Sequence, residues 1–129
     1  MGDCPSRTRI CYTSPMNDCI FCKIIAGEIP GKKIYEDDEL LAFHDAAPQA
    51  PVHFLVIPKK HIRNIMELGS DDTALPGKLL NKGQELAVKL GCAEKGARFV
   101  INCKSDGGQT VDHLHLHVLG GRPLAWPPG

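Results

Sequence analysis

The stretch His113-Leu114-His115-Leu116-His117-Val118-Leu119 alternates imidazole and aliphatic side chains. Successive side chains of a strand point to opposite faces, so the alternation predicts a strand with three imidazoles on one face and an aliphatic face turned toward a core. An imidazole titrates near neutral pH and can act as nucleophile, proton donor or metal ligand. One histidine on a strand is often a solvated side chain, but three in register indicate a functional site.

The segment that precedes this stretch predicts the kind of ligand. Residues 102–110 contain Asn102, the glycine pair Gly107-Gly108 and Thr110. Glycines let backbone N–H groups approach a ligand closely, and an amide and a hydroxyl add polar groups, so the segment has what is needed to hold a phosphate. A glycine pair alone is more often the connection of a hairpin. Directly before three alternating histidines, it favours an oxyanion site.

Around this candidate site the chain predicts an α+β domain. A short helix over residues 19–25 is capped by Asp18 and closed by Gly27. A long amphipathic helix over residues 73–90 carries leucines at helical spacing. Short runs rich in β-branched and aromatic residues predict five strands, at residues 33–36, 40–44, 52–57, 98–102 and 111–119. The expected architecture is a five-stranded antiparallel meander sheet with one long and one short helix.

Length and charge limit the domain organisation and the partners. The chain has 129 residues, with 15 Lys and Arg against 15 Asp and Glu. We expect one domain over residues 18–129 after a flexible leader over residues 1–17. Balanced, scattered charge argues against a nucleic-acid partner. Apolar runs stop short of the roughly 20 residues of a membrane span and a secretory signal is absent, so we expect a cytoplasmic protein that binds no membrane.

Cys19 and Cys22 are candidate metal ligands. Without a secretory signal, metal ligation or burial is favoured over disulfides for the 6 cysteines. Two thiols at i and i+3 of a short helix share a face and have the spacing of one half of a tetrahedral zinc site, which needs two further ligands. Cys92 and Cys103 lie in apolar stretches and are predicted to be small core residues.

Taken together, these motifs resemble the histidine triad (HIT) family, and specifically its Hint branch of nucleoside phosphoramidase-type nucleotide hydrolases. The resemblance covers about residues 18–129 and rests first on the His-x-His-x-His pattern of residues 113–117, followed by Val118 and Leu119. Further matching segments are Phe43-His44-Asp45, Pro48-Gln49-Ala50-Pro51-Val52-His53-Phe54, Pro58-Lys59-Lys60-His61, residues 102–110, Gly120-Gly121-Arg122 and Trp126-Pro127-Pro128-Gly129. The Hint branch is indicated by Gly-Gly-Gln-Thr at residues 107–110 and by the Trp-Pro-Pro-Gly tail. The implied fold is HIT-like.

The resemblance implies a role for each matching residue. His115 would attack the α-phosphorus of a purine nucleoside 5′-phosphoramidate, giving a nucleotidyl-histidine that water then hydrolyses; a neutral imidazole is a good nucleophile and, once protonated, a good leaving group. The implied catalytic set is His53, Thr110, His115 and His117. The implied nucleotide-binding set is Phe21, Ile24, Phe43, Asp45, Asn102, Gly108, Gln109, Thr110, His115 and His117. Asp45 would bind the ribose hydroxyls, and plain core packing is an equally good explanation for Phe21 and Ile24.

The resemblance also implies partners and a metal. The expected ligands are purine nucleoside phosphoramidates or AMP-like nucleotides, and the expected assembly is a homodimer whose tail, with Trp126, reaches the partner's site. Relatives with a matching cysteine pair bind a structural zinc, here through Cys19, Cys22, His61 and His113, and such a closed site takes no part in the chemistry. Other relatives lack both cysteines and metal.

Two alternatives stay open at the level of sequence. In the first, the protein is a zinc-dependent hydrolase in which His113, His115 and His117 hold a catalytic metal. In the second, it is a nucleotide-binding regulatory module without catalysis, because binding and catalysis use the same residues.

Overall fold

The computed structural model describes residues 18–129, so the expected leader over residues 1–17 lies outside the described part of the chain. The helices are α2 (Ile20–Ile25), α3 (Leu75–Lys89) and α4 (Lys104–Gly107). The strands are β1 (Lys33–Glu36), β2 (Leu40–His44), β3 (Val52–Pro58), β4 (Ala97–Val100) and β5 (Leu116–Gly120). Two short 3-10 turns, Ile65–Glu67 and Ser70–Asp72, connect β3 to α3.

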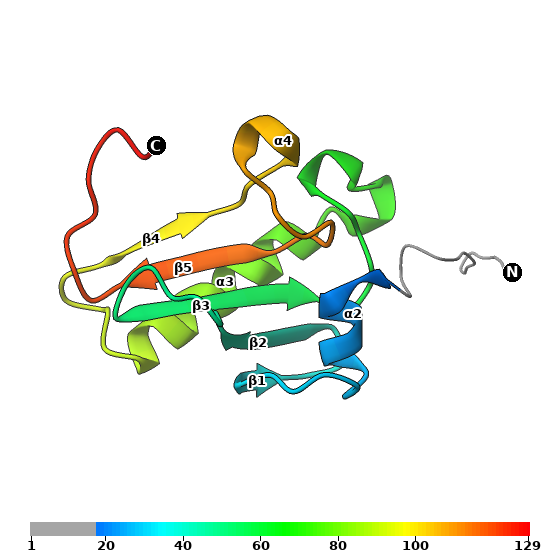
Figure 1. Ribbon diagram of the computed structural model, residues 1–129, viewed down its shortest axis with the longest axis horizontal. Coiled ribbons are helices and arrows are strands. Elements are labelled where there is room, and N and C mark those ends of the chain that lie inside the picture. Colours follow the sequence, from blue (N-terminus) through cyan, green and yellow to red (C-terminus); the bar gives the residue numbers. More distant parts are fainter. Residues whose placement is uncertain (1–17) are drawn as a thin grey trace, which may run out of the picture.

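The five strands form one antiparallel sheet in the order β1-β2-β3-β5-β4 (Figure 1). The predicted α+β class and five-stranded antiparallel sheet are confirmed. The meander prediction holds for β1 to β3 only. After β3 the chain crosses the sheet through α3 to the far edge, forms β4 there, and returns through α4 to place β5 between β3 and β4. β5 is therefore an interior strand.

Each face of the sheet packs against a helix, and the two faces have separate cores. α3 covers one face, where Leu114, Leu116 and Val118 are buried with side chains of β2 and β3. On the opposite face, the smaller core joins Phe21 and Ile24 of α2 to side chains of β2 and β3. The aliphatic half of the triad segment therefore faces α3, as the period of two predicts, and the histidine half faces the side of α2.

Gly83 lets α3 lie close to the sheet. A Cβ atom at this position would stand 2.9 Å from Leu116 Cδ2, 3.2 Å from Phe99 Cε2 and 3.3 Å from Val118 Cγ2. These separations are below ordinary van der Waals contact, so only a hydrogen side chain fits between α3 and β5 here.

Several predicted boundaries were wrong, each for a local reason. β5 begins at Leu116, not at residue 111, because the β3 ladder ends at the Val56–Leu116 pair. Residues 111–113 form a bend and residues 114–115 have no strand partner, and the Leu114 N–H donates instead to Ile62 O over 2.6 Å. The N-cap of α2 is Cys19, not Asp18, and its sulfur accepts the Cys22 N–H.

The glycine pair at residues 107 and 108 is not a hairpin connection. It ends the short helix α4, with Gly108 in the left-handed region at φ 79°. The long helix begins at Leu75, with a proline in its first turn. Within residues 18–129 no helix combines the length and the apolar character needed to cross a bilayer.

Candidate active site

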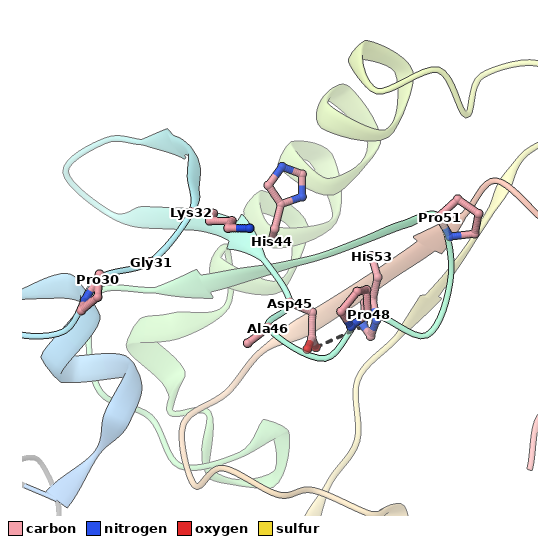
Figure 2. Close-up of a pocket in the computed structure, with 9 residues that line it drawn as sticks. All are labelled: Pro30, Gly31, Lys32, His44, Asp45, Ala46, Pro48, Pro51 and His53. Atoms are coloured by element: carbon pink, nitrogen blue, oxygen red, sulfur yellow. Dashed lines mark ion pairs between the residues drawn. The ribbon is translucent and has the colours of Figure 1, made fainter.

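A cavity of about 780 Å³ opens beside the loop that joins β2 to β3 (Figure 2). Its walls come from the segment before β1, the end of β2, this loop and the start of β3. The polar side chains that line it are Lys32, His44, Asp45 and His53, and three prolines add apolar surface. Asp45 and His53 are predicted site residues; Lys32 and His44 were not assigned a role from sequence.

His53 and His117 face each other across two neighbouring strands. Leu55 pairs with His117, and His53 lies two residues before Leu55, so both rings stand on the same face of the sheet. His53 Nε2 lies 3.0 Å from His117 Nδ1 and 3.3 Å from Asp45 Oδ2. The structure thus brings together three residues that the sequence placed in the site.

A backbone contact fixes which nitrogen of His53 carries the proton. The Gln49 N–H donates to His53 Nδ1 over 3.0 Å, so Nδ1 must present its lone pair. A neutral His53 therefore holds its proton on Nε2, between His117 Nδ1 and Asp45. If His53 donates to His117 Nδ1, neutral His117 in turn carries its proton on Nε2. Asp45, His53 and His117 are therefore linked by hydrogen bonds. Because His53 Nε2 carries a proton, it offers no lone pair to a metal.

His115 has the opposite tautomer, fixed by the main chain. Its Nδ1 lies 2.7 Å from the carbonyl oxygen of His113, which can only accept, so the His115 Nδ1–H donates and Nε2 is left with a lone pair. The Phe21 ring packs edge-on against the His115 ring, with centroids 5.1 Å apart. His115 is 3% exposed. Phe21 and the His113 carbonyl therefore hold this buried ring in one orientation, with the Nε2 lone pair unused by these contacts.

Burial keeps the site histidines neutral. Burial, and after it the neighbouring His115 and His53, lower the pKa of His117 to about 4, while Asp45 opposes them. Burial likewise lowers the pKa of His115 and of His53, again against the pull of Asp45. At neutral pH the three rings are therefore uncharged, which leaves lone pairs available for attack and for accepting hydrogen bonds.

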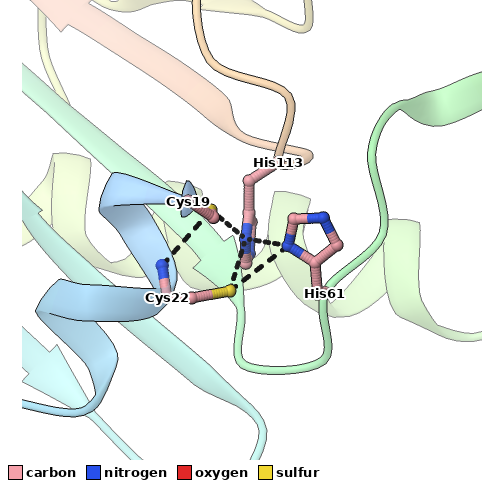
Figure 3. Close-up of side chains that lie close together, drawn as sticks. All are labelled: Cys19, Cys22, His61 and His113. Carbon is pink, nitrogen blue, oxygen red and sulfur yellow. Dashed lines mark hydrogen bonds between the residues drawn. The ribbon is translucent and has the colours of Figure 1, made fainter. Parts of the chain in front are cut away.

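His113 belongs to a second group, the Cys/His cluster, formed by Cys19, Cys22, His61 and His113 (Figure 3). One ligand atom of each lies within 4.8 Å of all the others. His113 Nε2 donates to the carbonyl oxygen of Pro58 over 2.8 Å, so its Nδ1 lone pair faces the two sulfurs. His61 Nε2 is buried without a hydrogen-bond partner among residues 18–129, so no contact at that nitrogen restricts the ring to one tautomer.

The distances within the Cys/His cluster fit a tetrahedral metal ion. His113 Nδ1 lies 3.3 Å from Cys19 Sγ, 3.6 Å from Cys22 Sγ and 3.2 Å from His61 Nδ1. Cys22 Sγ lies 3.2 Å from His61 Nδ1. A tetrahedron built on zinc–nitrogen bonds of about 2.05 Å and zinc–sulfur bonds of about 2.3 Å has nitrogen–nitrogen edges of roughly 3.3 Å, nitrogen–sulfur edges of roughly 3.6 Å and a sulfur–sulfur edge of roughly 3.8 Å. The four donors therefore match a structural zinc site in type, number and spacing.

One thiol of the Cys/His cluster is already disposed to ionise. The pKa of Cys19 is lowered, chiefly because the Cys22 thiol donates to its sulfur, and burial opposes this. The pKa of Cys22 is raised for the same reason and by burial. A thiolate at Cys19 suits a cation between the two sulfurs.

The three triad histidines do not converge on one point. His113 is directed at the cysteines and Pro58, His115 at the His113 carbonyl, and His117 at His53. Among the described residues, the two groups able to hold a metal are the Cys/His cluster and the Asp45–His53–His117 group. The alternative in which residues 113, 115 and 117 share a catalytic metal is therefore not supported by this geometry.

The candidate phosphate loop is held together by Gln109. Its side-chain oxygen accepts the Lys104 N–H, and its amide nitrogen donates to the carbonyl oxygens of Arg63 and Val111. The backbone N–H groups of Gly108 and Gln109 donate to Ser105 and Lys104 at the end of α4. Both N–H groups are thus used within the loop, the Gln109 amide positions the loop, and contact of Gly108 with a phosphate stays a prediction. Asn102 is half-buried and Thr110 is exposed.

The apolar candidates and the tail have different surroundings. Phe21, Ile24 and Phe43 are buried in the core under α2, which supports core packing for the first two; contact of all three with a base stays a prediction. Trp126 is 82% exposed. The tail that carries it is anchored where Arg98 donates to Ala125 O over 2.7 Å.

Comparison with known proteins places this geometry in a family. The HIT domain family matches residues 26–124. An uncharacterised HIT-like protein of Synechococcus elongatus is 57% identical over 112 residues, which cover 87% of this chain and 97% of that protein.

Solved structures agree with the sequence match. A HIT family hydrolase from Legionella pneumophila is 51% identical with a TM-score of 0.84, over 87% of this chain and 100% of that one. A histidine triad nucleotide-binding protein from Candida albicans is 32% identical with a TM-score of 0.73, over 85% of this chain and 83% of that one. The chain therefore belongs to the histidine triad (HIT) family.

Proposed function

We propose that this protein is a nucleotide-binding hydrolase that cleaves purine nucleoside 5′-phosphoramidates through a covalent intermediate on His115. The observation that carries the proposal is the hydrogen bond from His115 Nδ1–H to the His113 carbonyl, because it leaves the Nε2 lone pair free in a neutral, buried ring. Membership of the HIT family supports it. Relatives described as a hydrolase and as a nucleotide-binding protein have the same fold and are 51% and 32% identical in sequence.

The reaction divides into two displacements at phosphorus. In the first, His115 Nε2 bonds to the α-phosphorus, the bond from phosphorus to the leaving nitrogen breaks, and the departing amine takes the Nε2 proton of His117 in its imidazolium form, which the bound anionic phosphate favours. In the second, water attacks the phosphorus, gives a proton back to His117 and releases His115 with the nucleoside monophosphate. Two easier steps replace one difficult displacement.

Neighbouring residues have distinct parts in this scheme. His53 holds His117 in the tautomer that donates from Nε2. Asp45, which lines the cavity, accepts hydrogen bonds from the ribose hydroxyls. Asn102 and Thr110 supply donors to the phosphate oxygens, where prearranged dipoles stabilise the charge of the transition state. The apolar wall formed by Phe21, Ile24 and Phe43 receives the base.

The Cys/His cluster is proposed to hold a structural zinc ion. Zinc would link α2 to the segments that carry His61 and His113, and it would supply folding energy but no open coordination position for chemistry. The match of the donor spacing to a tetrahedron supports this assignment. Of the four proposed zinc ligands, His113 then affects catalysis only through its backbone carbonyl, which orients His115.

A homodimer is the proposed working assembly. Leu80 and Val88 lie two turns apart on α3 and are 46% and 49% exposed, and Phe99 on the neighbouring edge strand β4 is 38% exposed. A second copy that pairs with this face would bury the three side chains and cover the open edge of β4. The exposed Trp126 would then lie against the partner and influence the choice of leaving group.

The test is turnover of tryptamine and lysine phosphoramidates of AMP, combined with rapid quenching and intact-mass analysis at alkaline pH. We expect release of AMP and a transient mass increase of one nucleotidyl group. His115→Asn keeps a donor to the His113 carbonyl, and should lose at least about a thousandfold in kcat together with the adduct. The same variant should unfold like the wild type in urea.

The alternatives predict different results in this experiment. A metal-bound hydroxide as nucleophile gives AMP without any adduct. A regulatory binding module gives AMP binding by calorimetry without turnover. Activity of His115→Asn within about tenfold of the wild type would show that His115 is not the nucleophile.

A further inference from the structure

Arg122 lies just past β5 and has no part in the scheme above, yet its guanidinium joins the site loop to the tail. Arg122 Nε and Nη2 donate to the Gln49 carbonyl oxygen over 3.2 and 2.8 Å. Nη1 donates to Pro123 O over 3.0 Å. A planar guanidinium with three donors in use holds a fixed orientation, so the residue acts as a clamp between the tail and the loop of residues 45–51.

Gln49, whose carbonyl accepts from Arg122, also donates the hydrogen bond that orients His53. Gln49 accepts from Arg122 through its carbonyl oxygen and donates its backbone N–H to His53 Nδ1. His53 Nε2 then faces His117 Nδ1 at 3.0 Å. A continuous path of hydrogen bonds therefore leads from the exposed arginine to the histidine that protonates the leaving group.

Arg122 affects these hydrogen bonds by fixing the geometry of the Gln49 backbone and not by changing the strength of its N–H as a donor. The N–H and the C=O of Gln49 belong to two different peptide units separated by Cα, so the positive charge cannot strengthen the N–H donor through amide resonance. A clamped carbonyl instead holds the whole backbone of residue 49, and with it the direction in which the N–H points. Residues 46–49 are exposed and lie outside any helix or strand, so no ladder of backbone hydrogen bonds holds residue 49 in their place.

The surroundings of Gly121 support the same contact. Gly121 has φ 90°, and a Cβ atom there would stand 2.9 Å from Pro51 Cβ. The chain after β5 therefore turns tightly against the loop that carries Gln49, in a conformation that favours glycine. Arg122 is placed at the loop by this turn.

We propose that Arg122 is a positioning residue that sets the tautomers of His53 and His117 by clamping the Gln49 backbone. The inference rests on the proposed function for its effect on turnover, since His117 must donate from Nε2 to the leaving group. The clamp itself is a property of the folded chain without substrate.

The experiment compares Arg122→Met, which keeps an aliphatic stem but has no donor, with Arg122→Lys, which restores one charged donor. The matched control is Arg98→Met, because Arg98 also grips a tail carbonyl, that of Ala125, but does not contact the site loop. Each protein carries ¹⁵N-labelled histidine, and two-dimensional ¹H–¹⁵N spectra of the rings report which nitrogen is protonated. Turnover of the lysine phosphoramidate of AMP is measured on the same samples.

In the wild type and in Arg98→Met we expect His53 with Nδ1 unprotonated and Nε2 protonated. Arg122→Met should show averaged His53 and His117 patterns and a kcat lowered about three- to tenfold with little change in KM, and Arg122→Lys should recover part of both. An unchanged His53 pattern in Arg122→Met overturns the proposal, and so does a wild-type His53 protonated on Nδ1. The spectra need no substrate, so absent wild-type turnover contradicts only the proposed function and leaves the tautomer measurement to decide the role of Arg122.

Discussion

Three identical side chains in one short segment have three different neighbours, which engage Nε2 of His113 but Nδ1 of His115 and His117. His113 donates from Nε2 to Pro58 O, His115 donates from Nδ1 to His113 O, and His117 has its Nδ1 opposite His53. The free nitrogen of His113 therefore faces the sulfurs, that of His115 carries a lone pair for attack, and that of His117 carries a proton. At the scale of the residue, the differences between the three rings come from main-chain groups, namely the carbonyls of Pro58 and His113 and, through His53, the N–H of Gln49.

This division explains which part of the site the sequence could predict. Residue type and the period of two were enough to predict the imidazole face and the histidine donors. The partners that assign a tautomer are main-chain groups of Pro58, His113 and Gln49, and any residue type offers the same carbonyl or N–H. Arg122 and Lys32 were missed because their contacts depend on how two distant loops meet.

The low pKa of His117 predicts a pH-dependent stability. The folded value of about 4 lies below the value of about 6.5 for an unfolded chain, so between these values the unfolded state binds more protons. The free energy of unfolding should therefore be unaffected by this group above about pH 6.5 and fall as the pH is lowered toward 4, by up to about 3 kcal/mol. Urea unfolding at a series of pH values measures it.

His117→Gln should flatten this pH dependence, because it removes the titrating group. His44→Gln is the control, since His44 is exposed at the cavity wall and should leave the slope unchanged. Equal slopes in the wild type and in His117→Gln would contradict the assignment.

At the scale of the element, strands with hydrogen-bonded neighbours along their whole length were the predictable ones. The predicted bounds of β1 and β2 are correct, because these short runs rich in apolar residues end at turns where the ladder ends too. Residues 113–115 share the alternation of β5 but lie beyond the end of the β3 ladder, where the Cys/His cluster and Ile62 supply the contacts. The four-residue helix α4 is too short to show a helical period.

Gly83 predicts how closely α3 must pack on the sheet. Gly83→Ala places a Cβ 2.9 Å from Leu116 Cδ2, so it should destabilise the protein by about 1 to 3 kcal/mol although alanine favours helix. Gly77→Ala in the same helix is the matched control, because no atom lies within 4 Å of the added Cβ. Gly77→Ala should be neutral or stabilising by up to about 1 kcal/mol. Equal effects of the two substitutions in urea unfolding would show that propensity alone acts.

At the scale of the whole molecule, the Cys/His cluster joins parts of the chain that are far apart in sequence. Cys19 and His113 are separated by 94 positions, and Cys22 and His61 by 39. A metal ion on these four ligands would close both loops at once, and such closure restricts the unfolded chain more than the folded one.

Zinc content is the direct check on this cluster. Protein produced with zinc available should carry about one ion per chain, and Cys22→Ser should lose the ion and unfold at a lower temperature. Cys103→Ser is the control, because Cys103 lies outside the Cys/His cluster and should keep the metal. Elemental analysis without zinc in the wild type would leave the two thiols as buried apolar side chains.

The dimer makes a separate prediction. Leu80→Glu with Val88→Glu places two charges on the exposed apolar face of α3, and should convert a sedimenting dimer into a monomer. Met66→Glu is the control, because Met66 is more exposed but lies on the 3-10 turn Ile65–Glu67, away from this face. A wild-type monomer at micromolar concentration would contradict the assembly.

The position of β5 between β3 and β4 has a consequence for folding during synthesis of the chain. β5 is the last of the five strands to be synthesised, and it supplies the neighbour on which β4 depends and the second neighbour of β3. A nascent chain that ends before Leu116 can pair β1, β2 and β3, but β4 then has no strand beside it. Because synthesis is slow compared with local pairing, the first three strands wait for the fifth, and completion of the sheet coincides with arrival of the triad. The triad histidines therefore join the folded domain in the same event that completes its sheet.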